Sequence, residues 1–247
     1  MAFAGLKTHS KKIQDSVKIT PCLILVDNSD TIRPYISQVN ESLREMVKQI
    51  KEDQVCSSSV DLAIYSFNQG IREVLPFSKM PYLRNARIES LRVHSSIFGT
   101  CLGEAIEEAV KLLADHREAY ENDWVQTNMP NLLILSDFHP TFEPIQTTKR
   151  GIAAIRKKVE TEHWKCIPVG VGACVNEEIM QKIAGEGELI RFSGADQVQN
   201  IIAAFQFVSG QVISNCFEAA AGKMQGEIAR DVEKRRLGFE FIKKNGR

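Results

Sequence analysis

Blocks of hydrophobic positions with two different spacings follow one another along this chain, and they predict its elements. The apolar run at 18–26 is short and rich in aliphatic residues, which is typical of a buried strand. From Ile36 to Ile50, apolar residues recur every three or four positions, and this spacing predicts a helix with Pro34 near its start. We therefore expect a strand to give way to a helix across residues 27–31.

A hairpin and a further alternation of helices and strands follow. Residues 60–67 and 71–77 flank the turn sequence Asn68-Gln69-Gly70, which is typical of two antiparallel strands. Beyond a poorly patterned connection at 78–99, the predicted elements are helices at 102–120, 144–163, 176–184 and 197–213, and strands at 131–136, 164–171 and 189–192. This alternation, with central strands apolar on both faces, predicts an α/β fold. We expect a doubly wound, mostly parallel central sheet with one antiparallel edge strand and helices on both faces.

Composition and charge narrow the class of protein. The chain has 247 residues, 43% of them hydrophobic, which is enough for one large domain with a sizeable core. Lys and Arg total 31 and Asp and Glu total 31, so no net charge favours nucleic acid or an acidic membrane. The apolar run at the N-terminus is too short for a signal peptide, and no run approaches the roughly 18 apolar residues of a membrane span. We therefore expect a cytoplasmic protein that recognises its partner through a local site.

The cysteines are expected to be reduced. The chain has six, scattered without a Cys-x-x-Cys pair, and several fall in apolar strands. A free thiol in such a place behaves as a small hydrophobic side chain. A chain of this size does not need disulfides for stability, so we favour structural thiols over disulfides or a zinc site.

The pattern divides the chain into three parts. We expect an N-terminal extension at 1–17, the α/β domain at 18–213 and a basic helical extension at 214–247. From residue 219 to the end, eight basic residues face four acidic ones, and three apolar residues share one helical face. Two interpretations of this extension stay open: a solvated helix that packs on the domain, or a helix that docks a partner.

Carboxylates and hydroxyls follow the two most apolar strands, at the point where each strand ends. Asp27 ends the first strand, with Ser29 and Thr31 at alternate positions after it, and Asp137 ends the other. Thr100 precedes the second long helix. Ligands of doubly wound sheets bind beyond the carboxyl ends of neighbouring strands, so we expect these side chains to converge. Two carboxylates and three hydroxyls suit Mg²⁺, with Mn²⁺ a plausible substitute and Ca²⁺ a weaker one.

A second interpretation of these residues needs no cation. Asp, Ser and Thr between a strand and a helix are favoured helix caps and turn residues. Gly99 and Thr100 before a helix are likewise an ordinary capping sequence, and Asp is common at strand ends. The segments at 27–31, at 99–100 and at Asp137 occur together, in the order that places them at one edge of the predicted sheet. This joint occurrence favours metal coordination over helix capping.

The same segments resemble a known family. They are the run Asp27-x-Ser29-x-Thr31, the segment Gly99-Thr100-x-Leu102-Gly103 and the strand ending in Asp137. Together they are similar to a von Willebrand factor A domain with its metal-ion-dependent adhesion site, and the resemblance covers about residues 18–213. Within the family, residues 117–122 and 167–172 resemble bacterial stand-alone domains of the tellurium-resistance and stress-associated type.

The resemblance implies a Rossmann-like fold and a role for each residue of the motif. Ser29, Thr31 and Thr100 are expected to bind the metal, and Asp27 and Asp137 to bind it directly or through water. A Glu or Asp carboxylate from a protein partner is then expected to complete the metal's shell. On this interpretation the metal is a bridge between proteins, and the chain is not an enzyme.

Four positions depart from the usual pattern of the family. Thr31 replaces a Ser, which keeps the hydroxyl but restricts χ1. Asp30 and Phe138 stand where Gly is usual, and His139 replaces a residue that is often acidic. Phe138 is expected to matter most, since a bulky residue after Asp137 can cover the metal or demand a different backbone conformation. We therefore treat Asp30, Phe138 and His139 as modulators of the site.

Three functions follow from these residues. The leading hypothesis is a divalent-metal-dependent protein interaction module, in a bacterial stress or tellurium-resistance system. The first alternative is a metal-free scaffold of the same fold. The second is a magnesium-dependent phosphohydrolase, because an Asp at a strand end is also where aspartyl-phosphate enzymes place their nucleophile. Against it, Ser29 occupies the position where such enzymes carry a second acidic residue, and the chain has no Walker-type loop.

Overall fold

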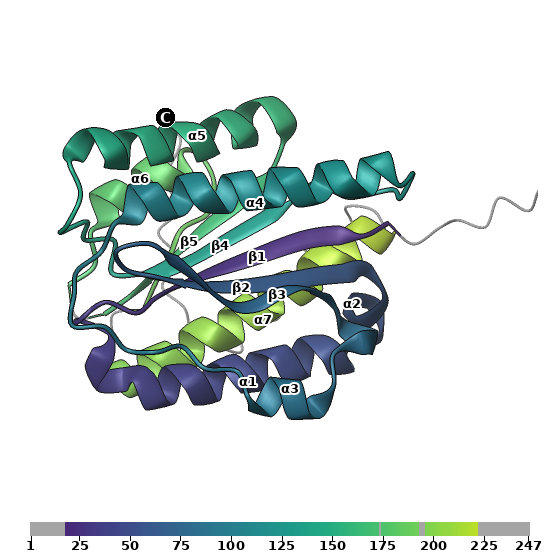
Figure 1. Cartoon of the computed structure of the whole chain (residues 1–247), viewed down its shortest axis with the longest axis horizontal. Coiled ribbons are helices and arrows are strands. Elements are labelled where there is room, and N and C mark those ends of the chain that lie inside the picture. The colour runs from purple at the N-terminus through teal and green to yellow at the C-terminus, as the bar shows by residue number, and fades with distance from the viewer. Residues whose placement is uncertain (1–17, 173, 193–195, 222–247) are drawn as a thin grey trace, which may run out of the picture.

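A six-stranded sheet runs through the centre of the computed structural model, which describes residues 18–172, 174–192 and 196–221 (Figure 1). Its strands are β1 (Thr20–Asp27), β2 (Val60–Phe67), β3 (Ile71–Lys79), β4 (Asn131–Ser136), β5 (Lys165–Val171) and β6 (Ile190–Phe192). The strand order is β3-β2-β1-β4-β5-β6. Neighbouring strands are parallel except β2 and β3, which form the antiparallel hairpin at one edge. The predicted fold class is confirmed.

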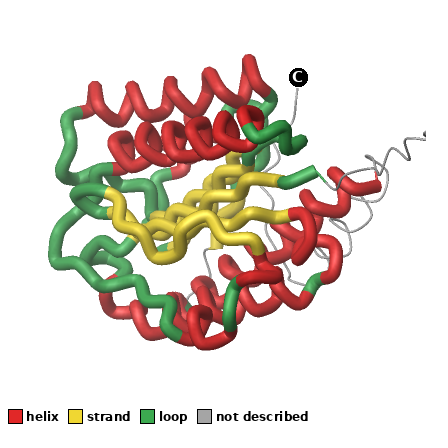
Figure 2. Tube along the Cα trace, turned by 45° about the vertical axis from the view of Figure 1, so that its right-hand side comes forward, coloured by secondary structure: helices red, strands yellow, loops and turns green. Residues whose placement is uncertain are grey.

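Helices cover both faces of the sheet (Figure 1, Figure 2). They are α1 (Ile36–Glu52), α2 (Gln54–Ser59), α3 (Asn85–Glu89), α4 (Leu102–Asn122), α5 (Ile145–Glu162), α6 (Glu177–Ala184) and α7 (Gln197–Ala221), with 3₁₀ turns at Arg33–Tyr35 and Met80–Tyr82. One face is covered by α4, α5 and α6, and the other by α1, α2, α3 and α7. Among the helices of the described residues, none is long and apolar enough to cross a membrane.

Side chains of β1 alternate between two apolar core layers. Leu23 and Leu25 pack with residues of α4, α5 and α6, whereas Ile24 and Val26 pack with residues of α1 and α7. All eight residues of β1 and all six of β4 are buried. Strands covered on both faces are apolar at every position rather than at alternate ones. The continuous apolar runs of the sequence arise from this double burial.

The carboxyl ends of β1 and β4 meet at one edge of the sheet. The two strands are parallel neighbours, and their register pairs Val26 with Leu135. The helix that follows β1, α1, lies on one face, and the helix that follows β4, α5, lies on the other (Figure 1). In a doubly wound sheet this change of side opens the crevice in which ligands bind. The topology therefore brings the residues after both strands to one place.

Two short helices lie where the sequence showed no helical pattern. The helices α2 and α3 have six and five residues, which is less than two turns each. At the start of α2, the side chain of Asp53 accepts a hydrogen bond of 2.8 Å from the N–H of Cys56. Helices this short are stabilised by caps and tertiary packing rather than by their own propensity.

The last described helix passes the predicted boundary of the domain. The helix α7 continues to Ala221, beyond the limit of 213 that the sequence suggested. The predicted N-terminal extension at 1–17 lies outside the described residues, and so does the predicted basic extension from residue 222 onward. The division of the chain into three parts stays a prediction.

Candidate metal centre

Two carboxylates lie at the edge where β1 and β4 end. Asp27 is the last residue of β1 and Asp137 directly follows β4, and their exposed fractions are 1% and 5%. The hydroxyl of Thr31 donates a hydrogen bond of 2.9 Å to Oδ2 of Asp137. Ser29 links Thr31 to Asp27. Its Oγ lies 3.0 Å from Oγ1 of Thr31, and its N–H donates a 2.8 Å hydrogen bond to Oδ1 of Asp27. Four of the five predicted ligands thus share one hydrogen-bonded network.

The turn after β1 does not use these hydroxyls as helix caps. The carbonyl of Ser29 accepts hydrogen bonds of 3.1 Å from the N–H groups of Ile32 and Arg33, and these bonds shape the turn. The N-cap residues of the 3₁₀ turn and of α1 are Ile32 and Tyr35, and neither makes a side-chain capping bond. Capping therefore does not explain why Ser and Thr occupy this turn.

Thr100 is held against the segment that leaves Asp137. Its N–H donates a 3.0 Å hydrogen bond to Oγ1 of Thr141, and its carbonyl accepts a 3.0 Å hydrogen bond from the N–H of Thr141. Thr100 is buried and forms a parallel bridge with Pro140. Within the described part of the chain, no hydrogen bond joins its hydroxyl to the other four predicted ligands. The N-cap of α4 is Cys101, so Thr100 does not cap that helix.

The three predicted modulators lie in different surroundings. Phe138 is fully buried among the core residues beneath α4 and α5, and its φ of +61° is in the left-handed region. Gly adopts this backbone conformation without strain, whereas a residue with a Cβ atom is strained in it, and the ring of Phe138 fills the core. Asp30 and His139 are exposed. Their N–H groups donate hydrogen bonds to the carbonyl of Phe98 at 3.2 Å and to Oδ1 of Asp137 at 3.0 Å, respectively.

The two carboxylates create a strongly negative and dry environment. Burial, together with the negative charge of Asp137, raises the pKa of Asp27 to about 6, although hydrogen bonds from Ser136 and Ser29 act in the opposite direction. No Lys, Arg or His among the described residues forms an ion pair with either carboxylate. Buried carboxylates without a counter-charge are costly, and a bound cation removes that cost.

A hard divalent cation fits this set of donors. The oxygens come from carboxylates and hydroxyls, which are the ligands that Mg²⁺, Mn²⁺ and Ca²⁺ prefer. Across the described residues, no three of His, Cys, Asp and Glu are placed to hold a metal together, which argues against a zinc-type site. Asp27, Ser29, Thr31 and Asp137 would hold the cation, with Thr100 contributed by the loop before α4.

Ser136 is a site residue that the sequence analysis missed. Its hydroxyl donates a 2.6 Å hydrogen bond to Oδ2 of Asp27 and accepts one of 2.9 Å from the N–H of Phe138. It is fully buried at the end of β4. A polar residue at the end of an otherwise apolar strand, next to Asp137, was the available signal.

Glu143 is a second residue that the sequence did not reveal. Its Oε1 accepts hydrogen bonds of 2.7 Å from the N–H of Gly103 and 2.8 Å from the hydroxyl of Thr148, and its Oε2 accepts one of 3.3 Å from the N–H of Glu104. A carboxylate from the loop after β4 thus satisfies the first N–H groups of α4 and interacts favourably with the helix dipole. This bond fixes the start of α4, just after Thr100, to the loop that follows Asp137.

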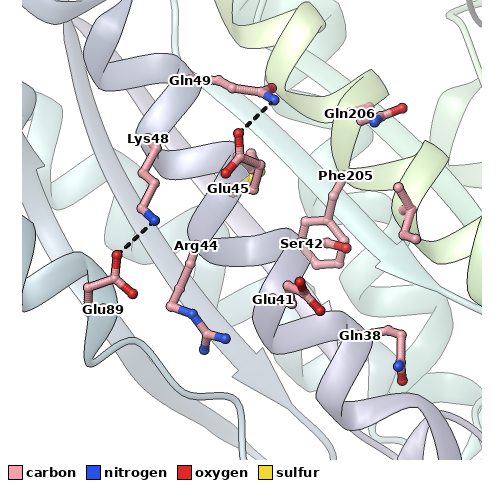
Figure 3. Close-up of a pocket in the computed structure, with 12 residues that line it drawn as sticks. Gln38, Glu41, Ser42, Arg44, Glu45, Lys48, Gln49, Glu89, Phe205 and Gln206 are labelled. Atoms are coloured by element: carbon pink, nitrogen blue, oxygen red, sulfur yellow. Dashed lines mark hydrogen bonds and ion pairs between the residues drawn. The ribbon is translucent and has the colours of Figure 1, made fainter.

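A hollow lies away from this edge, between α1 and α7 (Figure 3). Its volume is about 440 Å³. Lys48 pairs with Glu89 at 2.7 Å, and Gln49 donates a 3.4 Å hydrogen bond to Glu45 on the same wall. Residues of both charge signs line it without converging on one point, so we assign it no ligand.

The fold and this site define a class: a doubly wound α/β domain with an oxygen-lined site where β1 and β4 part. The family model for the von Willebrand factor type A domain matches residues 23–204. The chain belongs to this family. A comparison with curated proteins found no matching relative.

Solved structures share the fold at low sequence identity. The pilus adhesin SpaC from Lactobacillus rhamnosus GG superposes with a TM-score of 0.62 at 12% identity, over 81% of this chain and 30% of that one. A von Willebrand factor type A protein from Catenulispora acidiphila superposes with a TM-score of 0.57 at 13% identity, over 80% of this chain and 43% of that one. For the manganese-loaded TRAP protein of Plasmodium vivax, the TM-score is 0.51 at 16% identity, over 75% of this chain and 73% of that one. This chain spans less than half of the first two proteins, and the likeness is one of fold.

Proposed function

We propose that this chain is a divalent-metal-dependent protein interaction module. The cation is held by Asp27, Ser29, Thr31, Thr100 and Asp137. An Asp or Glu carboxylate of a protein partner completes its coordination shell. The observation that carries the proposal is a pair of buried carboxylates, linked through the hydroxyls of Thr31 and Ser29 and the N–H of Ser29. Among the described residues, no positively charged side chain forms an ion pair with either carboxylate.

The chemistry of the donor set supports a bridge rather than a catalyst. Two carboxylates balance the charge of a divalent cation, and three hydroxyls leave part of a six-oxygen shell for water or an incoming carboxylate. Mg²⁺ is our first choice and Mn²⁺ the second; the manganese-loaded TRAP structure supports testing both. We propose no reaction, because aspartyl-phosphate enzymes commonly carry a second acidic residue at the position where this chain has Ser29.

We extend the proposal to the setting of the protein. The resemblance of residues 117–122 and 167–172 to stress-associated bacterial domains supports a cytoplasmic role in stress or tellurium resistance. An affinity pull-down with the full chain as bait, with Mg²⁺ and with EDTA, tests this role. We expect captured proteins that are released by EDTA and that belong to such a system; capture unaffected by EDTA contradicts a metal bridge.

Metal binding is tested directly by calorimetry and thermal unfolding of the full chain. At about 100 times its Kd, Mg²⁺ stabilises a protein by about 2.7 kcal/mol, which corresponds to a rise in Tm of about 5 to 10 °C for a domain of this size. Asp27→Ala and Asp137→Ala are expected to abolish that rise. Asp115→Ala is the matched control, because Asp115 is exposed in the middle of α4 and is not part of the network.

The same measurement separates the proposal from a metal-free scaffold of the same fold. One observation favours the scaffold: the hydroxyl of Thr31 donates a 2.9 Å hydrogen bond to Oδ2 of Asp137 and so satisfies one oxygen of that carboxylate. If Mg²⁺, Mn²⁺ and Ca²⁺ all leave the Tm of the unmutated chain unchanged, the scaffold is the correct interpretation.

A further inference from the structure

Exposed apolar side chains gather on the two loops beside the candidate metal centre. Ile97 and Phe98 lie on the loop before α4, and Phe142 and Ile145 lie between β4 and the first turn of α5. These four side chains are 46 to 68% exposed. Exposed apolar side chains that cluster on a soluble domain mark interaction sites, whereas single ones are common.

The two loops are joined to each other and to the site. The ring of Phe142 lies against Gly99, because a Cβ atom added to Gly99 would be only 2.5 Å from that ring and 1.8 Å from Oγ1 of Thr141. Thr100, the next residue, pairs with Thr141 through two hydrogen bonds of 3.0 Å. On the other side, the carbonyl of Phe98 accepts a hydrogen bond from Asp30 in the turn after β1. The apolar side chains therefore flank Thr100 and adjoin the predicted ligands.

The two loops themselves add little negative charge to the site. In the described structure, loop residues 94–100 and 138–145 contain one carboxylate, that of Glu143, and it is occupied by two N–H groups and the hydroxyl of Thr148. A cavity of about 490 Å³ lies beside these loops, and Ile97, Phe98 and Arg72 are among the residues that line it. The surface next to the site thus combines apolar side chains with a cationic one.

We propose that Ile97, Phe98, Phe142 and Ile145 form an apolar rim that selects the partner's sequence. The occupant is a protein segment in which the metal-bound Asp or Glu has a large aliphatic or aromatic residue beside it. The cation binds the carboxylate, and the rim buries the neighbouring apolar side chain. This inference rests on the proposed function, since it assumes that the partner's carboxylate reaches the cation.

The first test is a selection of peptides on the full chain. The probe is a phage-displayed library with a fixed central Asp and random flanking positions, selected in Mg²⁺ and eluted with EDTA. We expect Phe, Trp, Leu or Ile to be enriched beside the Asp. The proposed role of the rim is contradicted if the EDTA-eluted peptides show no enrichment of apolar residues beside the Asp, or if no peptide is enriched at all. Calorimetry with Mg²⁺ alone is run in parallel, so that failure of metal binding is recognised as failure of the proposed function.

The second test uses variants of exposed residues, which leave the core intact. Phe98→Ser with Phe142→Ser is expected to weaken binding of a selected peptide about 10- to 100-fold, as truncation of aromatic anchors does, with Mg²⁺ binding unchanged. Tyr82→Ser is the control, because Tyr82 is 81% exposed in the 3₁₀ turn that follows β3. The last residue of β3 pairs with the start of β2, so this turn lies at the end of the sheet opposite to the candidate site. Equal affinity of the double variant and the control overturns the proposal. So does a concentration-dependent dimer of the unmutated chain that the double variant abolishes, because a second copy then covers the rim.

Discussion

The hydroxyl of Ser136 donates a 2.6 Å hydrogen bond to Oδ2 of Asp27, from the last residue of β4 to the last residue of β1. The other oxygen of that carboxylate accepts the N–H of Ser29 at 2.8 Å. Both oxygens are therefore oriented by the protein before any cation binds. An arrangement of this kind lowers the cost of ordering a ligand and tunes its affinity for metal.

Removing the Ser136 hydroxyl is expected to weaken metal binding without removing a ligand. For Ser136→Ala we predict a loss of about 10- to 100-fold in Mg²⁺ affinity, by calorimetry, because loss of an outer-shell partner has this effect. The metal-free protein should lose about 1 to 3 kcal/mol of unfolding free energy, because Oδ2 of Asp27 and the N–H of Phe138 lose the hydrogen bonds that Ser136 makes to them. Ser66→Ala is the matched control. Ser66 is equally buried, on β2, and its hydroxyl has no hydrogen-bond partner in the described structure. Equal losses in both variants contradict the role given to Ser136.

The raised pKa of Asp27 predicts a pH dependence of stability in the metal-free protein. Its pKa rises from 3.8 to about 6 on folding, so between these values the folded state binds more protons than the unfolded state. The contribution of Asp27 to stability is therefore largest below pH 4 and falls as pH rises through 6, by about 3 kcal/mol in total. Urea unfolding of the metal-free chain and of Asp27→Asn, from pH 4 to 7, isolates this contribution as their difference. A difference that does not change with pH contradicts the prediction, and saturating Mg²⁺ at neutral pH should remove the loss.

The main elements of the fold were visible in the sequence because burial imposes a pattern on it. All residues of β1 and β4 are buried, so both strands appear as continuous apolar runs, and α4 is long enough to repeat its apolar spacing several times. The helices α2 and α3 are too short to repeat any spacing. Their stability comes from contacts that a local pattern does not contain.

The candidate site was visible only in part, for a related reason. Asp27, Ser29 and Thr31 lie within five residues of one another, and a local motif reveals them. The hydrogen bonds of Ser136 to Asp27 and of Glu143 to Gly103 join residues 109 and 40 positions apart. The pairing of strands and loops decides such bonds, and no spacing along the chain encodes them.

Close contact between α4 and α5 predicts that Gly103 does not tolerate a side chain. A Cβ atom added there would lie 2.4 Å from the carbonyl oxygen of Thr147, which is a main-chain atom of the facing helix. Gly103→Ala is expected to destabilise the chain by about 1 to 3 kcal/mol, as overpacking does, despite the better helix propensity of Ala. At Gly70 an added Cβ meets nothing within 4 Å, so Gly70→Ala should change stability little. Urea unfolding of both variants measures the contrast, and an unchanged Gly103→Ala protein contradicts it.

The left-handed backbone of Phe138 predicts an unusual order of substitutions. Phe138 has a φ of +61° and is fully buried, so its ring stabilises the fold while its Cβ atom strains the backbone. Phe138→Ala loses the ring, at a cost of about 3 to 5 kcal/mol, and keeps the strain. Phe138→Gly loses the same ring but relieves the strain, so it should be more stable than Phe138→Ala by about 1 kcal/mol. Phe67, which is also buried but is not among the positive-φ residues, should show the opposite order, because Gly in a strand is less stable than Ala. Urea unfolding of the four variants decides the matter: if Ala is the more stable replacement at both positions, backbone strain at Phe138 is not significant.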